Sequence, residues 1–84
     1  MKAIVSVIGK DKKGIIAKVS NALYEMSINI EDISQTIMQD YFTMIMAVDI
    51  AECPLKFDAI AKQLSILGNE NRLEIHIQLQ SIFD

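Results

Sequence analysis

The residues best placed to do chemistry form a short glycine-bounded segment, Gly9-Lys-Asp-Lys-Lys-Gly14, which Ile15 and Ile16 follow. The two glycines have the G-x-x-x-x-G spacing of a phosphate-binding loop. Ile15 and Ile16, however, stand where such a loop needs a lysine and a hydroxyl to meet phosphates and magnesium. Two interpretations remain. The segment is either a turn with solvated lysines, or a site where the unpaired N–H groups that open a helix bind a carboxylate or another small anion.

Two further side chains with reactive groups carry weaker signals. Cys53 is the only cysteine, which excludes an internal disulfide framework and a paired-cysteine metal site and fits a reducing cytoplasm. Because no base is adjacent to it in the sequence, we do not expect Cys53 to act as a nucleophile. His76 stands between Glu74 and Gln78 on a polar face, where a lone histidine is more typical of a surface than of a metal site. We expect no enzyme activity, no metal and no cofactor.

Composition restricts the class of protein further. The 84 residues allow one domain, over 1–84, and the net charge of −3 disfavours a nucleic-acid partner. No uncharged run approaches the roughly 20 residues that span a bilayer, so we expect a cytoplasmic protein with no membrane partner. Because a domain this small buries only about 60–65% of its unfolded surface, a homodimer that buries more is expected.

The period of the apolar residues defines the elements. The clearest strand is 72–80, in which Leu73, Ile75 and Ile77 alternate with polar residues. Apolar residues three or four apart predict one helix from Ile15 to near 27, and a second that begins around Glu52-Cys53-Pro54 and stops at Gly68-Asn69. The remaining strands are predicted over 2–8, 29–39 and 42–50.

This order, βαββαβ, predicts an α+β ferredoxin-like sandwich with an antiparallel sheet in strand order 4-1-3-2 and both helices on one face. The patterning supports the same order independently. Strands 2–8 and 42–50 are apolar on both faces and belong in the centre, whereas 29–39 and 72–80 carry polar alternation and belong at the edges. The second apolar face of the two central strands indicates an interface.

The segment 9–20, together with Ile28-Asn29-Ile30 and Ile33-Ser-Gln-Thr36, strongly resembles the ACT domain, and more closely the short stand-alone ACT proteins of the UPF0237 group. The pattern Gly-x-Asp-x-x-Gly-Ile, a helix and then x-Asn-Ile is the most specific part of this resemblance. It implies a regulatory domain, and many such domains bind amino acids at dimer interfaces. Carried over by position, the resemblance implies a ligand site made by Asp11, Gly14, Ile15 and Ile16 in the loop and by Asn29 and Ile30 across from it.

Two of these residues have a structural interpretation as well as a functional one. Asn29 is either a turn residue that tolerates unusual φ and ψ angles, or an amide whose donors and acceptor face the ammonium or carboxylate of a ligand. Asp11 either caps the helix or stabilises the turn, or it accepts a hydrogen bond from an amino group. The sequence leaves both alternatives open.

Other functions that use this fold need residues that the chain lacks. An RNA-recognition domain needs basic and aromatic residues on its central strands, and 3–8 and 42–48 offer one aromatic residue and no lysine or arginine. A heavy-metal-binding domain needs two cysteines. We therefore predict a homodimeric sensor that binds a small molecule, with an amino acid as the expected ligand, and modulates a separate effector protein. The alternative is a protein–protein interaction module that binds no ligand.

Overall fold

The computed structural model of the chain describes residues 1–10 and 13–83. In this part of the chain four strands, two α-helices and one short 3-10 helix follow one another in the predicted order. Their bounds are β1 Lys2–Lys10, α1 Ile15–Glu25, β2 Asn29–Met38, β3 Tyr41–Asp49, α2 Phe57–Asn71, β4 Leu73–Leu79 and the 3-10 helix η1 Gln80–Phe83.

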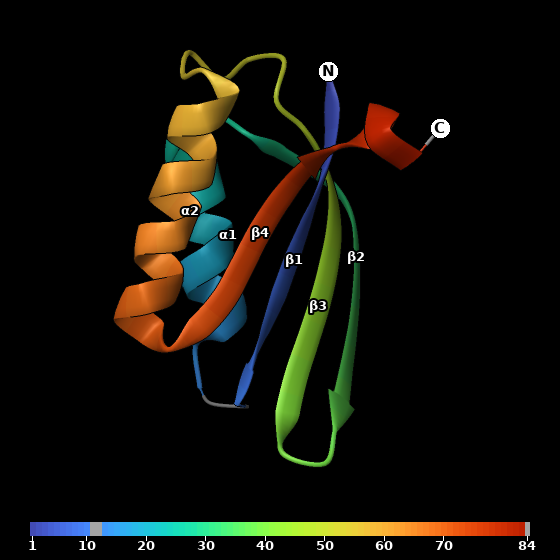
Figure 1. The fold of residues 1–84 in the computed structure, drawn as a ribbon, viewed down its shortest axis with the longest axis vertical. Helices are drawn as coiled ribbons and strands as arrows, with labels where there is room; N and C mark the ends of the chain where they lie inside the picture. Colours follow the sequence, from blue (N-terminus) through green and yellow to red (C-terminus); the bar gives the residue numbers. More distant parts are fainter. Residues whose placement is uncertain (11–12, 84) are drawn as a thin grey trace.

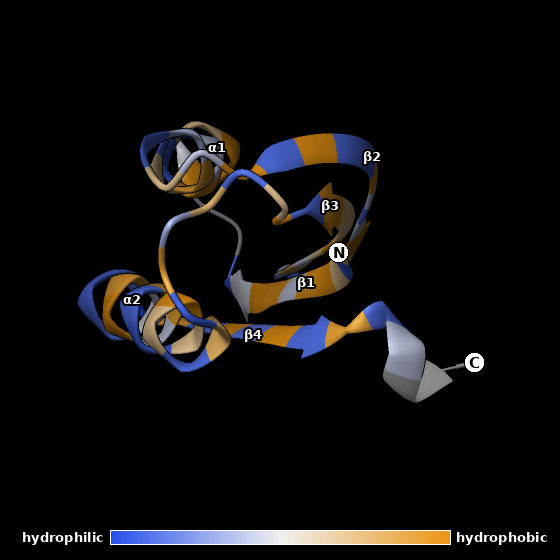
Figure 2. Ribbon diagram, turned by 90° about the horizontal axis from the view of Figure 1, so that it is seen from above, coloured by the Kyte–Doolittle hydropathy of each residue, from blue (hydrophilic) through white to orange (hydrophobic). Residues whose placement is uncertain are grey.

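The four strands form one antiparallel sheet in the order β2-β3-β1-β4, which confirms the predicted topology. Both helices lie on the same face of this sheet, with α2 beside β4 and α1 toward β2 (Figures 1 and 2). The register places Val5 of β1 opposite Met46 of β3 and Ile77 of β4. Residues directly opposite in this way point to the same face, so the alternating apolar positions of all three strands meet under the helices.

The hydrophobic core lies between the sheet and the two helices. Alternate residues of the central strands are fully buried there, and Val19 and Leu23 of α1 and Ile60 and Leu64 of α2 close over them. These helical residues are three or four positions apart, the spacing of one helix face. Burial of this face against the sheet stabilises helices that are too short to persist alone in water.

The opposite face of the sheet, which we call the outer face, is only partly covered. The central strands were expected to be covered on both sides, yet Ile8 of β1 is 46% exposed and Ile45 of β3 is 49% exposed on the outer face. Within the described part of a single chain no second layer packs there, because both helices lie on the other side (Figure 2). The sequence pattern therefore reports an apolar outer face, which one copy of the chain leaves open to solvent.

Helix α2 differs from its predicted bounds at both ends. It begins at Phe57 after Lys56 in extended conformation, not at Pro54, and it continues past Gly68 to Asn71. Gly68 does not stop the helix but is buried inside it, where a Cβ would lie 2.5 Å from the carbonyl oxygen of Leu73. The glycine is required because α2 passes very close to the backbone of β4 at this point. The helix ends instead with Arg72, at φ 57° and ψ 43°.

We expect Gly68→Ala to destabilise the protein by about 1–3 kcal/mol, because the added methyl group meets backbone that cannot move without shifting α2 away from β4. The change runs against helix propensity, which favours alanine over glycine by about 1 kcal/mol. Chemical denaturation measures the difference, with Asn69→Ala at the neighbouring exposed position as the control. A Gly68→Ala protein as stable as the parent would contradict the close approach of helix and strand.

Candidate functional site

The start of α1 is built around Gly14, which adopts the left-handed conformation with φ 83°. The first backbone bond of the helix is donated by the N–H of Lys18 to the carbonyl oxygen of Gly14. The N–H groups before Lys18 in the first turn have no partner within the helix, and no side chain among the described residues caps them. Asp11, for which we predicted either a capping or an amino-binding role, lies outside the described residues.

An open cavity of about 240 Å³ lies at this helix start. Among the described residues, Gln35 has the only polar side chain in its lining, and a Cβ added to Gly14 would meet no atom of these residues within 4 Å. Ile16 and Ile37 are 39% and 59% exposed and form apolar walls accessible from solvent. The complete lining comprises Gly14, Ile15, Ile16 and Ala17 of α1, Gln35 and Ile37 of β2, and Phe42 of β3.

Asn29 lies at a different place, where the chain leaves α1 and enters β2. Ser27 turns the chain here with φ 60°, and the N–H of Ile28 donates to the carbonyl oxygen of Leu23 at 2.9 Å. Ile28 is buried, Ile30 is half-buried, and Asn29 is exposed. A shallow hollow of about 420 Å³ lies here, lined by Tyr24, Glu25, Ser27, Ile28 and Asn29.

Within one chain these two groups of predicted site residues do not meet. Gly14, Ile15 and Ile16 stand at the start of α1, and Asn29 and Ile30 follow its end. The helix has 11 residues and is therefore about 16 Å long, and its two ends lie at opposite ends of the sheet (Figure 1). In one copy of the chain the predicted residues thus form two separate groups, which we call half-sites, and a ligand common to them stays a prediction.

Charged groups near Asn29 are held by specific contacts. The Lys2 ammonium donates to both carboxylate oxygens of Glu31 at 2.6 Å, and this hydrogen bond raises the pKa of Lys2. The N–H of Ala51 donates to the Asp49 carboxylate at 2.9 Å, which lowers the pKa of that carboxyl group. Asp49 lies opposite Asn29 in the sheet. The Asn29 end of β2 is therefore rich in carboxylates with fixed positions.

The two reactive side chains considered in the sequence lie apart from both half-sites. Cys53 is half-buried in the β3–α2 connection. His76 lies on β4 with its Nε2 3.3 Å from a carboxylate oxygen of Glu74, and both side chains are largely exposed. Residues 1–10 and 13–83 contain no cluster of three histidine, cysteine or carboxylate side chains suited to a metal ion. In the same ranges no helix is both long and apolar enough to cross a membrane.

Sequence reasoning missed three residues of the cavity at the helix start, namely Gln35, Ile37 and Phe42. A usable signal was present for two of them. Gln35 and Ile37 alternate with Ser34 and Thr36 and so share one face of their strand. With both helices assigned to one face of the sheet, this period places either the odd or the even positions of β2 beside α1. Only the register with β3 decides between the two sets, since Gln35 pairs with the buried Met44.

Comparison with known proteins gives the family. The ACT domain model matches residues 2–78. A UPF0237 protein of Clostridium acetobutylicum is 55% identical and one of Listeria innocua is 50% identical, each over the whole of this chain and 94% of the relative. Both relatives share the full length of the fold described above.

Solved structures agree with this result. An ACT domain protein from Streptococcus pneumoniae has a TM-score of 0.90 and 40% identity, over 100% of this chain and 94% of that one. The regulatory subunit of aspartate kinase from Thermus thermophilus has a TM-score of 0.70 and 25% identity over 92% of this chain and 50% of that one. The matches in sequence and structure cover nearly all of the chain, and the protein belongs to the ACT domain family, in its UPF0237 group.

Proposed function

We propose that this chain, acting as a single domain over residues 1–84, is a cytoplasmic homodimeric sensor that binds an amino acid and modulates a separate effector protein. The observation that carries this proposal is the start of α1, which no side chain among the described residues caps, beside an apolar, solvent-accessible cavity. In this function the chain performs no catalysis and holds no cofactor. The resemblance of the fold to a regulatory subunit of aspartate kinase supports a regulatory role.

The chemistry of the two half-sites fits the three parts of an amino acid. Backbone N–H groups at the start of α1 suit a carboxylate, and the open space beside Gly14 lets the ligand approach them closely. Ile16 and Ile37 offer apolar surface to a side chain. The Asn29 amide carries one acceptor and two donors and suits an ammonium group or the second carboxylate oxygen, and Asp11 would add a further acceptor.

Antiparallel pairing of β2 with β2 of a second copy would join the half-sites. β2 is an edge strand, and nearly all its residues are exposed. Because the second copy runs in the opposite direction, Asn29 of one copy would lie beside the Ile37 end of β2 in the other. Charge supports this arrangement: Glu31 and Asp32 stand near Asn29, whereas lysines, Lys10 and Lys13 among them, stand near the start of α1.

A thermal-shift screen of the full chain against the twenty amino acids tests ligand binding. At 100 times its dissociation constant, a ligand that binds only the folded protein adds about 2.7 kcal/mol to the free energy of unfolding. In a domain of this size that corresponds to a rise in melting temperature of at least about 10 °C. A flat response to every amino acid would instead favour the protein–protein interaction module without a ligand.

Sedimentation equilibrium at micromolar concentration tests the dimer separately. A specific stable interface buries at least about 1,000 Å² in total, and such a dimer sediments at twice the 9.4 kDa of one chain. A species of 9.4 kDa alone would overturn the homodimer and with it the combined site.

A further inference from the structure

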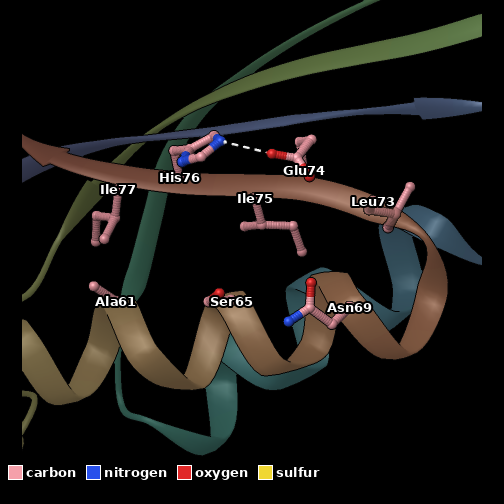
Figure 3. A pocket seen from close by; sticks show the side chains of 8 residues that line it. All are labelled: Ala61, Ser65, Asn69, Leu73, Glu74, Ile75, His76 and Ile77. Carbon is pink, nitrogen blue, oxygen red and sulfur yellow. Dashed lines mark ion pairs between the residues drawn. The ribbon is translucent and has the colours of Figure 1, made fainter.

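The second edge of the sheet carries a groove of its own. This groove, about 260 Å³ in volume, runs between β4 and α2. Figure 3 shows Ala61, Ser65 and Asn69 pointing from α2 toward β4, while Glu74 and His76 point away from the helix. The five consecutive residues 73–77 of β4 complete its lining. We call this feature the β4–α2 groove.

β4 is an edge strand with few of the features that usually protect an edge, although Glu74 gives it one exposed charge. It pairs with β1 on one side only, and its sequence, Leu-Glu-Ile-His-Ile-Gln-Leu, contains no lysine and no proline. The pairing of β4 with β1 has no bulge, whereas β2 has an irregularity between Ile30 and Asp32. Unprotected edges present a row of unpaired backbone groups, and native proteins rarely leave them uncovered.

We propose that the β4–α2 groove docks an extended segment of the effector protein, which adds to the sheet as a fifth strand beside β4. A strand matches the backbone donors and acceptors of an edge, which a partner helix cannot do. The small side chains of Ala61, Ser65 and Asn69 leave room for alternate side chains of the incoming strand between β4 and α2. This inference rests on the proposed function, since it names the surface through which the sensor reaches its effector.

Symmetry argues that the occupant is a different protein and not a second copy. The proposed homodimer already uses the β2 edge of each chain. If β4 also paired with itself, every copy would carry two self-pairing edges, and the sheets would join into an open-ended filament. A strand from another protein closes each end of the dimer instead, with two effector segments per dimer.

The charge of Glu74 indicates which side chains the docking segment carries. A strand paired with β4 would place one set of side chains beside Glu74, which is 75% exposed in its side chain and lies on the outer face with His76 3.3 Å away. Cross-strand partners of opposite charge are favoured, so a lysine or arginine is expected next to Glu74. The alternate side chains would face Ser65 and Asn69, which are exposed and uncharged, and are expected to be small. The occupant is thus an extended basic segment in which lysine or arginine alternates with small residues.

Nuclear magnetic resonance titration of the full-length ¹⁵N-labelled chain tests the proposal. The probe is an acetylated and amidated nine-residue peptide in which lysine alternates with valine and threonine, and a second peptide has glutamate at each lysine position. We expect changes in amide chemical shift confined to β4 and the facing side of α2. The affinity for the lysine peptide is expected to be about two- to fivefold higher than that for the glutamate peptide. Glu74→Lys is expected to reverse this preference. Glu70→Lys makes the same charge change on α2 outside the groove and is expected to leave the preference for the lysine peptide unchanged.

A steric variant gives a second test. Ser65→Trp fills the groove at an exposed helix position and is expected to abolish the shifts while the remaining spectrum stays that of the folded protein. Absence of shifts with millimolar lysine peptide, shifts on β2, or equal effects of Glu70→Lys and Glu74→Lys would each overturn the proposal. Shifts on β4 in a chain that sediments at 9.4 kDa would contradict the proposed homodimer but keep the docking strand.

Discussion

Leu64→Ala is expected to lower the free energy of unfolding by about 2–5 kcal/mol, because Leu64 is fully buried on the face of α2 that packs on the sheet. The loss has two parts: the transfer free energy of the deleted carbons, and the cavity that close-packed neighbours cannot fill. Small domains have a total stability of about 5–15 kcal/mol. A melting temperature lower by at least about 10 °C is therefore expected in differential scanning calorimetry.

Ile66→Ala is the matched control for this experiment. Ile66 lies on the same helix but is 42% exposed. Its truncation to alanine removes aliphatic carbons, as Leu64→Ala does, but opens no fully enclosed cavity. We expect a smaller loss, of about 1 kcal/mol. If Leu64→Ala melts within a degree or two of the parent while Ile66→Ala is clearly destabilised, the assignment of the buried face of α2 is wrong.

The sequence was sufficient to predict the buried faces of both helices and of β4. Leu23 and Leu64 were found by apolar spacing of three and four, and both are fully buried. Leu73, Ile75 and Ile77 were found by strict alternation, and all three are buried on β4. These predictions succeeded because period two and period 3.6 report directly on one-sided burial, which packing between the sheet and the helices imposes on α1, α2 and β4.

The bounds of α2 could not be predicted because tertiary contacts decide them. A glycine followed by asparagine is a typical helix stop, and Gly68-Asn69 was interpreted in this way. The structure uses Gly68 for the close passage of α2 over the backbone of Leu73. Local propensity cannot distinguish a glycine that ends a helix from one that lets a strand approach it.

The candidate site was only partly predictable, because its lining also depends on tertiary contacts. The loop glycine and Ile16 were found from the resemblance and do line a cavity. Gln35 and Ile37 were missed because their position beside α1 depends on the register of the β2–β3 hairpin. The separation of Asn29 from the loop by the length of α1 follows from the topology, and a site that joins the two half-sites across a dimer remains the proposal made above.

Asn29→Ala is expected to weaken amino-acid binding by about 5- to 150-fold and to leave the fold intact. A lost hydrogen bond in a desolvated site costs about 1–3 kcal/mol, and 1.4 kcal/mol is a factor of ten. Asn29 is exposed in one chain, so its truncation opens no cavity. Isothermal titration calorimetry measures the affinity, with Asn69→Ala as the control because Asn69 is exposed and lines neither half-site. Unchanged affinity in a chain with both Asn29→Ala and Asp11→Ala would contradict the site.

A mixture of two variants tests whether the half-sites come from different copies. Ile16→Asp alters the cavity at the start of α1, at a residue 39% exposed, and is expected to prevent carboxylate binding there. If each site joins Asn29 of one copy to Ile16 of the other, a dimer of Asn29→Ala with Ile16→Asp holds one doubly altered site and one unaltered site. Random mixing of equal amounts then restores about a quarter of all sites with the parent affinity, because half of the dimers are mixed. A site built within one chain would regain none, since every chain in the mixture carries a defect.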